Sequence, residues 1–272
     1  MNKQSTKPKV IICTLARDRA WCLPVFFRFL DTIEYPKSRL HHLFIVNGVQ
    51  QDNTLELIQA RAEENKNVHI IVDTEEMPPE SANKADRATD GLYLHLARLR
   101  DIGLRYCQDH GYDYIFQLDS DVMVLPNVLD KLVSVNVDYS VASIVQYNID
   151  LIEKIERDLI TLDYTRNTKL SNPYRLQRKQ YWRIDNDRLL EGYAEGSGIS
   201  LISRRMIESG CNHCYEENKD LSVVKSEDIT FAEKAKGGGF QCWRHSGAVV
   251  FHLYEKSLMT RSILPNWNGY ST

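Results

Sequence analysis

Short apolar runs alternate with amphipathic segments of helix length through the first half of this chain, and that alternation constrains the fold more than any other feature. The apolar runs have the length of strands, and turn or capping residues separate them from the helices. The expected strands cover residues 10–15, 43–46, 68–72 and 112–118, and the expected helices cover 24–33, a segment from 53, and 92–106. Strands that alternate with helices predict an α/β fold, with a mixed, mainly parallel central sheet and helices on both faces.

Composition narrows the possible classes of protein. A chain of 272 residues, 43% of them hydrophobic, can bury the core of one domain, so we expect a single domain over residues 1–272. The formal net charge of −3 gives no basic footprint for non-specific binding of nucleic acid. No apolar run reaches the length that spans a membrane, and the N-terminal residues contain no signal-peptide core. These features predict a cytoplasmic protein without a transmembrane segment.

Two carboxylates, Asp119 and Asp121, follow the fourth expected strand with only Ser120 between them. Acidic residues are poor strand formers, and two negative charges this close are costly unless a cation lies between them. Mg²⁺ and Mn²⁺ take oxygen ligands from one or two carboxylates and leave other positions for water and substrate phosphates. An Asp-rich turn is the plainer interpretation of an isolated pair. The surrounding sequence decides between the two.

The loops after the first two strands are expected near the same carboxylates. Ligands of parallel α/β sheets bind beyond the carboxyl ends of the strands. Residues 14–19 follow the first strand, 47–53 follow the second, and Asp119 and Asp121 follow the fourth. We therefore expect one binding site at this edge of the sheet.

A series of motifs in a consistent order resembles the GT-A glycosyltransferases, particularly the large inverting family typified by bacterial sugar transferases (family 2-like). The motifs lie at residues 14–18, 46–54, 97–104, 118–121, 195–205, 226–231 and 249–254. The resemblance spans residues 10 to about 254, and residues 147–190 match least. It implies a GT-A (Rossmann-like) fold and a metal-dependent transfer of a sugar from a nucleotide-diphosphate sugar to an acceptor hydroxyl, with inversion.

The resemblance also implies a metal site. In the family's pattern the last acid of the Asp-x-Asp motif binds the ion, while the first contacts the ribose or the ion's water shell, which gives these roles to Asp121 and Asp119. His252 resembles a histidine that some GT-A enzymes use as a second protein ligand, and its imidazole would favour Mn²⁺ over Mg²⁺. A single histidine after a strand also fits a core residue. Both interpretations of His252 stay open.

Inversion needs one base to accept the proton of the attacking hydroxyl. Glu227 and Asp228, at the start of an expected helix over residues 229–236, resemble the paired acids of the family. The resemblance implies that Asp228 is the base and that Glu227 holds the acceptor or serves as the alternative base. Acids in a first helical turn, with Ser226 as cap, are also favoured without any catalytic role.

Donor binding is assigned by the same resemblance. It puts the nucleotide near Thr14, Arg17 and Asp52 and gives Arg98 a place at the nucleotide or diphosphate. The acidic pair that commonly follows the second strand is replaced here by Asn47 and a glycine, so UDP-sugars and GDP-sugars both stay open.

The acceptor is assigned with less detail. Gly196, Ser197 and Gly198 allow a sugar to approach the backbone closely, or form a flexible turn. Trp182 lies among arginines and tyrosines in residues 147–190, which we interpret as a lid over the site. The acceptor is a glycan, a lipid-linked precursor, a protein or a nucleic acid. The donor half is expected at residues 8–126, the acceptor half at 127–256 and a tail at 257–272.

Two other interpretations remain. Cys211, Cys214, Cys242 and His245 have the spacing of zinc ligands, although strand alternation would point Cys242 and His245 to opposite faces. The alternative functions are a nucleotidyltransferase of Rossmann-like fold and a catalytically inactive sugar-binding relative. A nucleotidyltransferase usually has a Gly-rich loop after its first strand, and residues 14–19 contain no glycine.

Overall fold

The computed structural model describes residues 7–48, 50–75, 90–146, 189–192, 196–213 and 226–253. Trp182, Cys214, nearly all of the expected lid and the tail at 257–272 lie outside these residues. The expected division into donor and acceptor halves stays a prediction.

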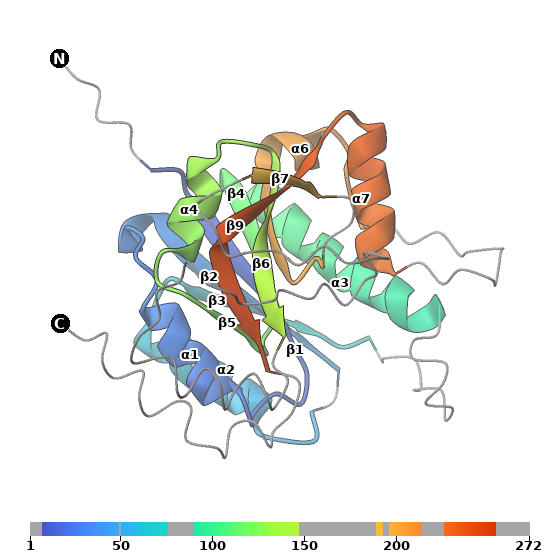
Figure 1. Ribbon diagram of the computed structural model, residues 1–272. Helices are drawn as coiled ribbons and strands as arrows, with labels where there is room; N and C mark the ends of the chain where they lie inside the picture. The colour runs from blue at the N-terminus through green and yellow to red at the C-terminus, as the bar shows by residue number, and fades with distance from the viewer. Residues whose placement is uncertain are drawn as a thin grey trace.

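The described strands form one mixed sheet, in the order β3-β2-β1-β4-β8-β6-β9-β5, with β7 paired to β9 (Figure 1). They are β1 (Val10–Ala16), β2 (Leu40–Asn47), β3 (Val68–Asp73), β4 (Tyr114–Leu118), β5 (Val122–Val124), β6 (Tyr139–Gln146), β7 (Leu189–Gly192), β8 (Ile199–Ser203) and β9 (Cys242–His252). The first four in sequence pair parallel as β3-β2-β1-β4. The predicted α/β fold with a mixed sheet is confirmed.

The second part of the sheet reverses direction. β8 lies antiparallel between β4 and β6, and β9 pairs parallel with β6 and antiparallel with β5. The β5–β9 register sets Val122 opposite His252. This pairing brings the end of the described chain to the strand that follows Asp121.

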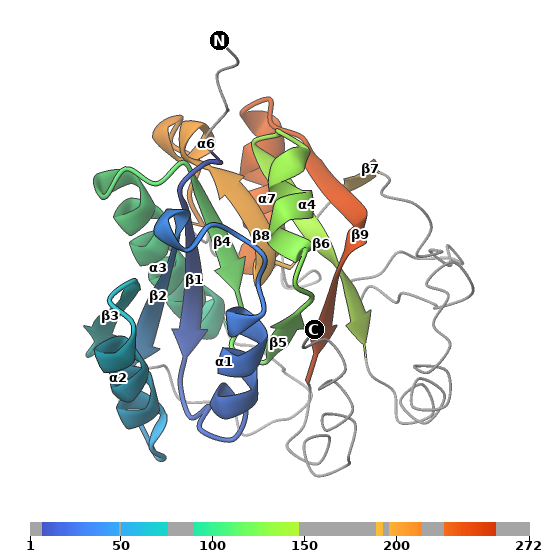
Figure 2. The ribbon, with the colours of Figure 1, turned by 90° about the vertical axis from the view of Figure 1, so that its left-hand side faces the viewer.

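Helices cover both faces of the sheet, as Figure 2 shows for α1, α2 and α4 on one side and α3 and α7 on the other. Their bounds are α1 (Leu23–Asp31), α2 (Thr54–Glu64), α3 (Asp90–Asp109), α4 (Val128–Ser134), α6 (Arg204–Glu208) and α7 (Glu227–Gly237), with a 3₁₀ turn at Lys37–Arg39. β1 alternates between the two layers, because Val10 and Ile12 belong to one core and Ile11 and Cys13 to the other. Both faces of the strand are therefore buried, as expected for parallel sheets.

The long helix α3 packs closely against β1. A Cβ atom added to Gly103 would lie 2.6 Å from Cys13 Sγ, so only glycine allows this approach. Leu99 and Gly103 lie on the buried side of this helix, which also includes two polar residues, His95 and Arg100. Arg100 proves central to the site.

Within the part of the chain that the structure describes, no helix is both long and apolar enough to cross a membrane. The cytoplasmic location stays a prediction.

Candidate active site

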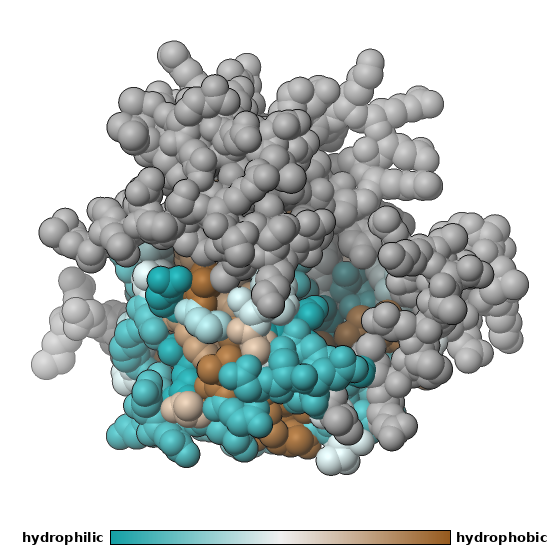
Figure 3. All heavy atoms as spheres, turned by 90° about the horizontal axis from the view of Figure 1, so that it is seen from below, coloured by the Kyte–Doolittle hydropathy of each residue, from teal (hydrophilic) through white to brown (hydrophobic). Residues whose placement is uncertain are grey.

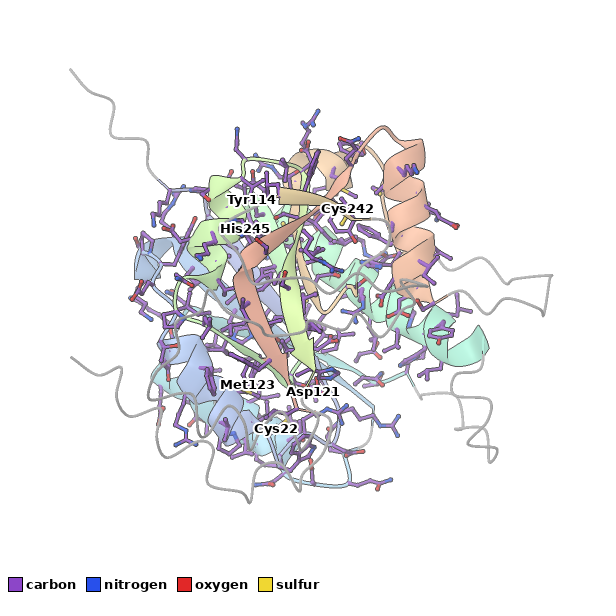
Figure 4. All side chains as sticks on the ribbon, in the orientation of Figure 1. Cys22, Tyr114, Asp121, Met123, Cys242 and His245 are labelled. Atoms are coloured by element: carbon purple, nitrogen blue, oxygen red, sulfur yellow. The ribbon has the colours of Figure 1, made fainter. Side chains whose placement is uncertain are left out.

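The site lies at the carboxyl end of β4, where Asp119, Ser120 and Asp121 connect β4 to β5. The backbone N–H of Asp119 donates to the Gly198 carbonyl (3.0 Å), and the Leu253 N–H donates to the Asp121 carbonyl (2.8 Å). The Ser120 carbonyl accepts a weak bond from Cys22 Sγ at the start of α1 (3.4 Å). Figure 4 shows Asp121 and Cys22 together at the lower end of the sheet. Three separate elements therefore hold this short connection in place.

Asp121 pairs with a histidine from the far end of the chain. His252 Nε2 lies 3.3 Å from Asp121 Oδ1, because β9 runs beside β5. Burial alone would raise the pKa of Asp121, but the hydrogen bond and charge of His252, with a smaller effect of Arg19, hold that pKa below its usual value. Asp121 is therefore an ionised carboxylate at neutral pH, as a metal ligand must be.

Asp119 contacts a buried arginine. Arg100 Nη2 donates to Asp119 Oδ1 at 3.2 Å, and Arg100 itself is only 7% exposed. The pKa of Asp119 is raised, first by its removal from bulk water; Arg100 opposes this rise, while the charges of Asp121 and Asp228 add to it. The two acids of the motif therefore have different environments, and Asp121 is the more strongly ionised.

Gly198 packs directly against the carboxylate of Asp119. A Cβ atom at this position would lie 1.9 Å from Asp119 Oδ2, a distance that no real contact reaches. The glycine is thus required for the observed orientation of Asp119, whatever its part in acceptor binding.

Gly198→Ala is expected to turn Asp119 away from its present position and to lower turnover by about a hundredfold, the size of effect seen when catalytic groups move by about 1 Å. Gly237→Ala is the matched control, since a Cβ there would meet nothing within 4 Å. Turnover and melting temperature of both variants test this expectation. Equal turnover of the two variants would show that the orientation of Asp119 is unimportant.

Glu227 and Asp228, the predicted acids of the second motif, begin α7. Asp228 Oδ1 accepts a hydrogen bond from the Ser197 backbone N–H at 2.9 Å, and its side chain is partly exposed. Glu227 is buried at 4% exposure, and burial, followed by the charge of Asp228, raises its pKa to about 8. Ser226 occupies the N-cap position, but the expected side-chain cap is absent, since its hydroxyl makes no hydrogen bond there.

Arg100 joins the two halves of the site. Its Nε lies 3.4 Å from Glu227 Oε1 while its Nη2 contacts Asp119. These contacts close a ring. Arg100 donates to Asp119, and the Asp119 N–H donates to the carbonyl of Gly198. The N–H of the neighbouring Ser197 donates to Asp228, and the adjacent Glu227 contacts Arg100 again. Sequence reasoning missed Arg100 and selected Arg98. Residues two apart on a helix point about 200° from each other, so only one of the two arginines faces the site.

The predicted donor residues have different places. Thr14 is fully buried on β1, with Oγ1 3.0 Å from His42 Nε2. Arg98 is held by both oxygens of Asp73 (2.9 and 2.7 Å) and by Glu75 (2.9 Å) at the end of β3. The side chains of Thr14 and Arg98 thus contact residues of β2 and of the end of β3, and their donor-binding roles stay predictions.

The other two predicted donor residues lie in the loops beyond β1 and β2. Asp52 Oδ2 accepts from the Ala20 N–H (3.1 Å), and Oδ1 accepts from the Thr54 N–H (3.0 Å). Asp52 therefore joins the two loops. Arg17 lies at the first of them, 3.7 Å from Asp18. Figure 3 views this end of the molecule, where the described surface is mainly hydrophilic with smaller hydrophobic areas.

The residues present fit a divalent ion that is bound together with its substrate. Asp121 and His252 bring an oxygen and a nitrogen donor to within 3.3 Å of each other. No group of three or more His, Cys, Asp or Glu side chains is arranged to hold an ion in the described ranges. Two protein ligands, with the remaining positions filled by phosphate and water, are the usual arrangement for Mg²⁺ at nucleotide sites.

The zinc interpretation receives no support from the described cysteines. Cys242 and His245 both lie on β9 and, in Figure 4, at the opposite end of the sheet from Asp121. Cys211 is buried at 8% exposure, and Cys214 lies outside the described residues. The cysteines 13, 22, 107, 211 and 242 are all free thiols.

Comparison with known families agrees with this geometry. The family model described as "Glycosyltransferase family 25, N-terminal domain" matches residues 7–148, more than half of the chain. The chain belongs to glycosyltransferase family 25. The matched segment contains β1 to β6 and the Asp119–Asp121 pair. The predicted resemblance to GT-A glycosyltransferases is confirmed, and within them the matching model is that of family 25.

Relatives from animals share this N-terminal segment. A glycosyltransferase 25 family member of Anopheles gambiae is 29% identical over 131 residues, which cover 46% of this chain and 22% of that protein. Procollagen galactosyltransferase 2 of Homo sapiens is 28% identical over 135 residues, which cover 47% and 21%. The matched region spans about a fifth of the length of these curated relatives.

Solved structures share the fold. A mannosyltransferase from Pyrobaculum calidifontis, in complex with GDP-Man and Mn²⁺, has a TM-score of 0.58 at 12% identity and covers 95% of this chain and 59% of its own. S. aureus TarS in complex with UDP-GlcNAc has a TM-score of 0.56 at 13% identity, with 91% and 59% covered. Together they show a GT-A fold for the family 25 chain.

Proposed function

We propose that this family 25 chain transfers a sugar from a nucleotide-diphosphate sugar to an acceptor hydroxyl, with a divalent ion and with inversion at the anomeric carbon. The observation that supports the proposal most is the ring of contacts through Arg100. It joins Asp119, beside the ion-binding Asp121, to Asp228 at the start of α7. The reaction needs such a pair of charged regions, one for the leaving diphosphate and one for the attacking hydroxyl.

Asp121 and His252 would hold the ion. When bound, Mn²⁺ or Mg²⁺ supplies positive charge where the departing diphosphate becomes more negative. Asp119 would bind the ribose or the water around the ion, because Arg100 already occupies one of its oxygens.

Asp228 would accept the proton of the attacking hydroxyl. Its Oδ1 is oriented by the Ser197 N–H, and its partly exposed side chain is open to an acceptor. Glu227 is buried, and burial raises its pKa to about 8; this favours the protonated carboxyl at neutral pH, which is a far weaker base than a carboxylate. We therefore keep Asp228 as the base and assign Glu227 to the support of α7 through Arg100.

Relatives and neighbours suggest substrates to test. The neighbouring structures contain GDP-Man, UDP-GlcNAc or UDP, so both nucleotide classes remain in the proposal. Relatives named procollagen galactosyltransferase favour a protein hydroxyl as acceptor and galactose as the sugar to try first.

Release of nucleoside diphosphate from a panel of donors tests the proposal. UDP-galactose, UDP-GlcNAc and GDP-mannose would each be incubated with Mn²⁺ and candidate acceptors. We expect release of UDP or GDP that depends on the acceptor. Release of the sugar 1-phosphate instead would indicate a nucleotidyltransferase, and donor binding without any release would indicate an inactive sugar-binding protein.

A further inference from the structure

Arg19, between β1 and α1, has a firmly held backbone and a side chain open to solvent. Its N–H donates to Thr54 Oγ1 at 2.6 Å, and its carbonyl accepts from the Leu23 N–H at 3.1 Å. The next N–H, that of Ala20, donates to Asp52. The side chain is nevertheless 39% exposed. The fold therefore presents this guanidinium from a fixed point of the backbone.

The guanidinium points to the ion-binding carboxylate. Arg19 Nη2 lies 3.8 Å from Asp121 Oδ2, while His252 occupies the other oxygen, Oδ1, at 3.3 Å. A distance of 3.8 Å is too long for a hydrogen bond. Nη1 donates to the Arg17 carbonyl at 3.3 Å, and the other nitrogens of the guanidinium, Nε and Nη2, have no hydrogen-bond partner among the residues that the structure describes. The guanidinium is thus held near Asp121 without being neutralised by a close pair.

We propose that Arg19 binds the diphosphate of the nucleotide donor. Asp121 would hold the ion that accompanies the donor, and this guanidinium lies beside Asp121, where it would meet the donor's diphosphate. The planar fork of an arginine matches phosphate oxygens and stays charged at every physiological pH. The inference rests on the proposed function and extends it to a residue that no sequence motif assigned.

Arg98, the arginine predicted at this place, is already occupied. Two carboxylates, Asp73 and Glu75, bind it at 2.7 to 2.9 Å. A phosphate would have to displace both acids to reach Arg98. The guanidinium of Arg19 still has N–H groups that can donate to a phosphate.

The position of Arg19 has effects of opposite sign on two ligands. Its positive charge, 3.8 Å from Asp121, repels a bare Mn²⁺ ion. The same charge attracts a nucleoside diphosphate that arrives with the ion. A residue that merely maintains the loop would affect both ligands in the same direction.

Isothermal titration with Mn²⁺, uridine, UDP and GDP tests the inference without any turnover. For Arg19→Gln we expect UDP or GDP, whichever the unaltered protein binds, to bind about tenfold or more weakly in saturating Mn²⁺, as for the loss of a charged hydrogen bond. Binding of uridine should be unchanged, and Mn²⁺ alone should bind equally or more tightly. Arg19→Lys should recover part of the diphosphate affinity.

Arg39→Gln is the matched control. Arg39 is 37% exposed and lies 3.8 Å from Asp113, so its exposure and its distance to a carboxylate resemble those of Arg19. Unlike Arg19, it lies near the amino ends of the strands. The Arg39→Gln variant should bind every ligand with the affinity of the unaltered protein. Unchanged diphosphate affinity in Arg19→Gln, or an equal loss for Mn²⁺ alone, would overturn the inference. If the unaltered protein binds neither UDP nor GDP, the proposed function itself fails.

Discussion

Asp121→Asn is expected to abolish sugar transfer, with a loss of roughly a thousandfold or more. Asparagine keeps the size of the side chain and its hydrogen bond from His252, but it removes the negative charge that holds the ion. The low pKa of Asp121 shows that the structure favours this charge. The turnover of Asp121→Asn and of the unaltered protein should be compared over a range of Mn²⁺ concentrations, with the donor from which nucleoside diphosphate is released.

Asp109→Asn controls for the loss of an acid elsewhere, because Asp109 is exposed at the end of α3. Its turnover should equal that of the unaltered protein.

His252→Ala should need a higher Mn²⁺ concentration for half-maximal activity while losing less activity than Asp121→Asn, since the Asp121 ligand remains. Full turnover of the unaltered protein in excess chelator would remove the ion from the mechanism, and an unchanged Mn²⁺ titration of His252→Ala would make His252 a structural residue.

Asp228→Asn is expected to lower kcat by roughly two to four orders of magnitude, the range for the loss of a positioned general base. The amide oxygen of asparagine can still accept the Ser197 N–H, so the turn at Gly196–Gly198 should keep its shape. Affinity for the donor should change little. Separate measurements of kcat and of donor affinity by titration distinguish this result from general damage to the fold.

Glu227→Gln is the companion variant. Burial and the charge of Asp228 raise the pKa of Glu227 to about 8, which favours the protonated acid at neutral pH, and glutamine resembles that acid in shape and charge. We therefore expect nearly normal kcat at pH 7. If Glu227→Gln loses two or more orders of magnitude while Asp228→Asn does not, the roles of the two acids must be exchanged.

The sequence was sufficient to predict the first four strands and the pair of acids. Strand–helix alternation predicts parallel pairing, and the apolar run from Tyr114 to Leu118 places Asp119 and Asp121 at its end. β1, β2 and β3 each extend one to three residues beyond their predicted limits at one or both ends. These differences arise because hydrogen bonding to neighbouring strands continues past the apolar residues that mark a strand in the sequence.

Contacts between distant elements could not be predicted in the same way. The choice between Arg98 and Arg100 depends on the rotation of α3, which Gly103 sets by its close approach to Cys13. A signal was present, since Arg100 directly follows the buried Leu99 and lies three residues before Gly103. Arg19 belongs to the loop of residues 14–19 that the sequence places at this edge, but only the folded loop brings its side chain beside Asp121.

The configuration of the newly formed glycosidic linkage tests the central claim most directly. In the proposed mechanism, one carboxylate, Asp228, deprotonates the hydroxyl that attacks from the side opposite the ion-bound diphosphate, and a single displacement must invert the anomeric carbon. Nuclear magnetic resonance of the product made from an α-linked nucleotide sugar should therefore show a β-linkage. An α-linked product would contradict single displacement and the role of Asp228 as its base.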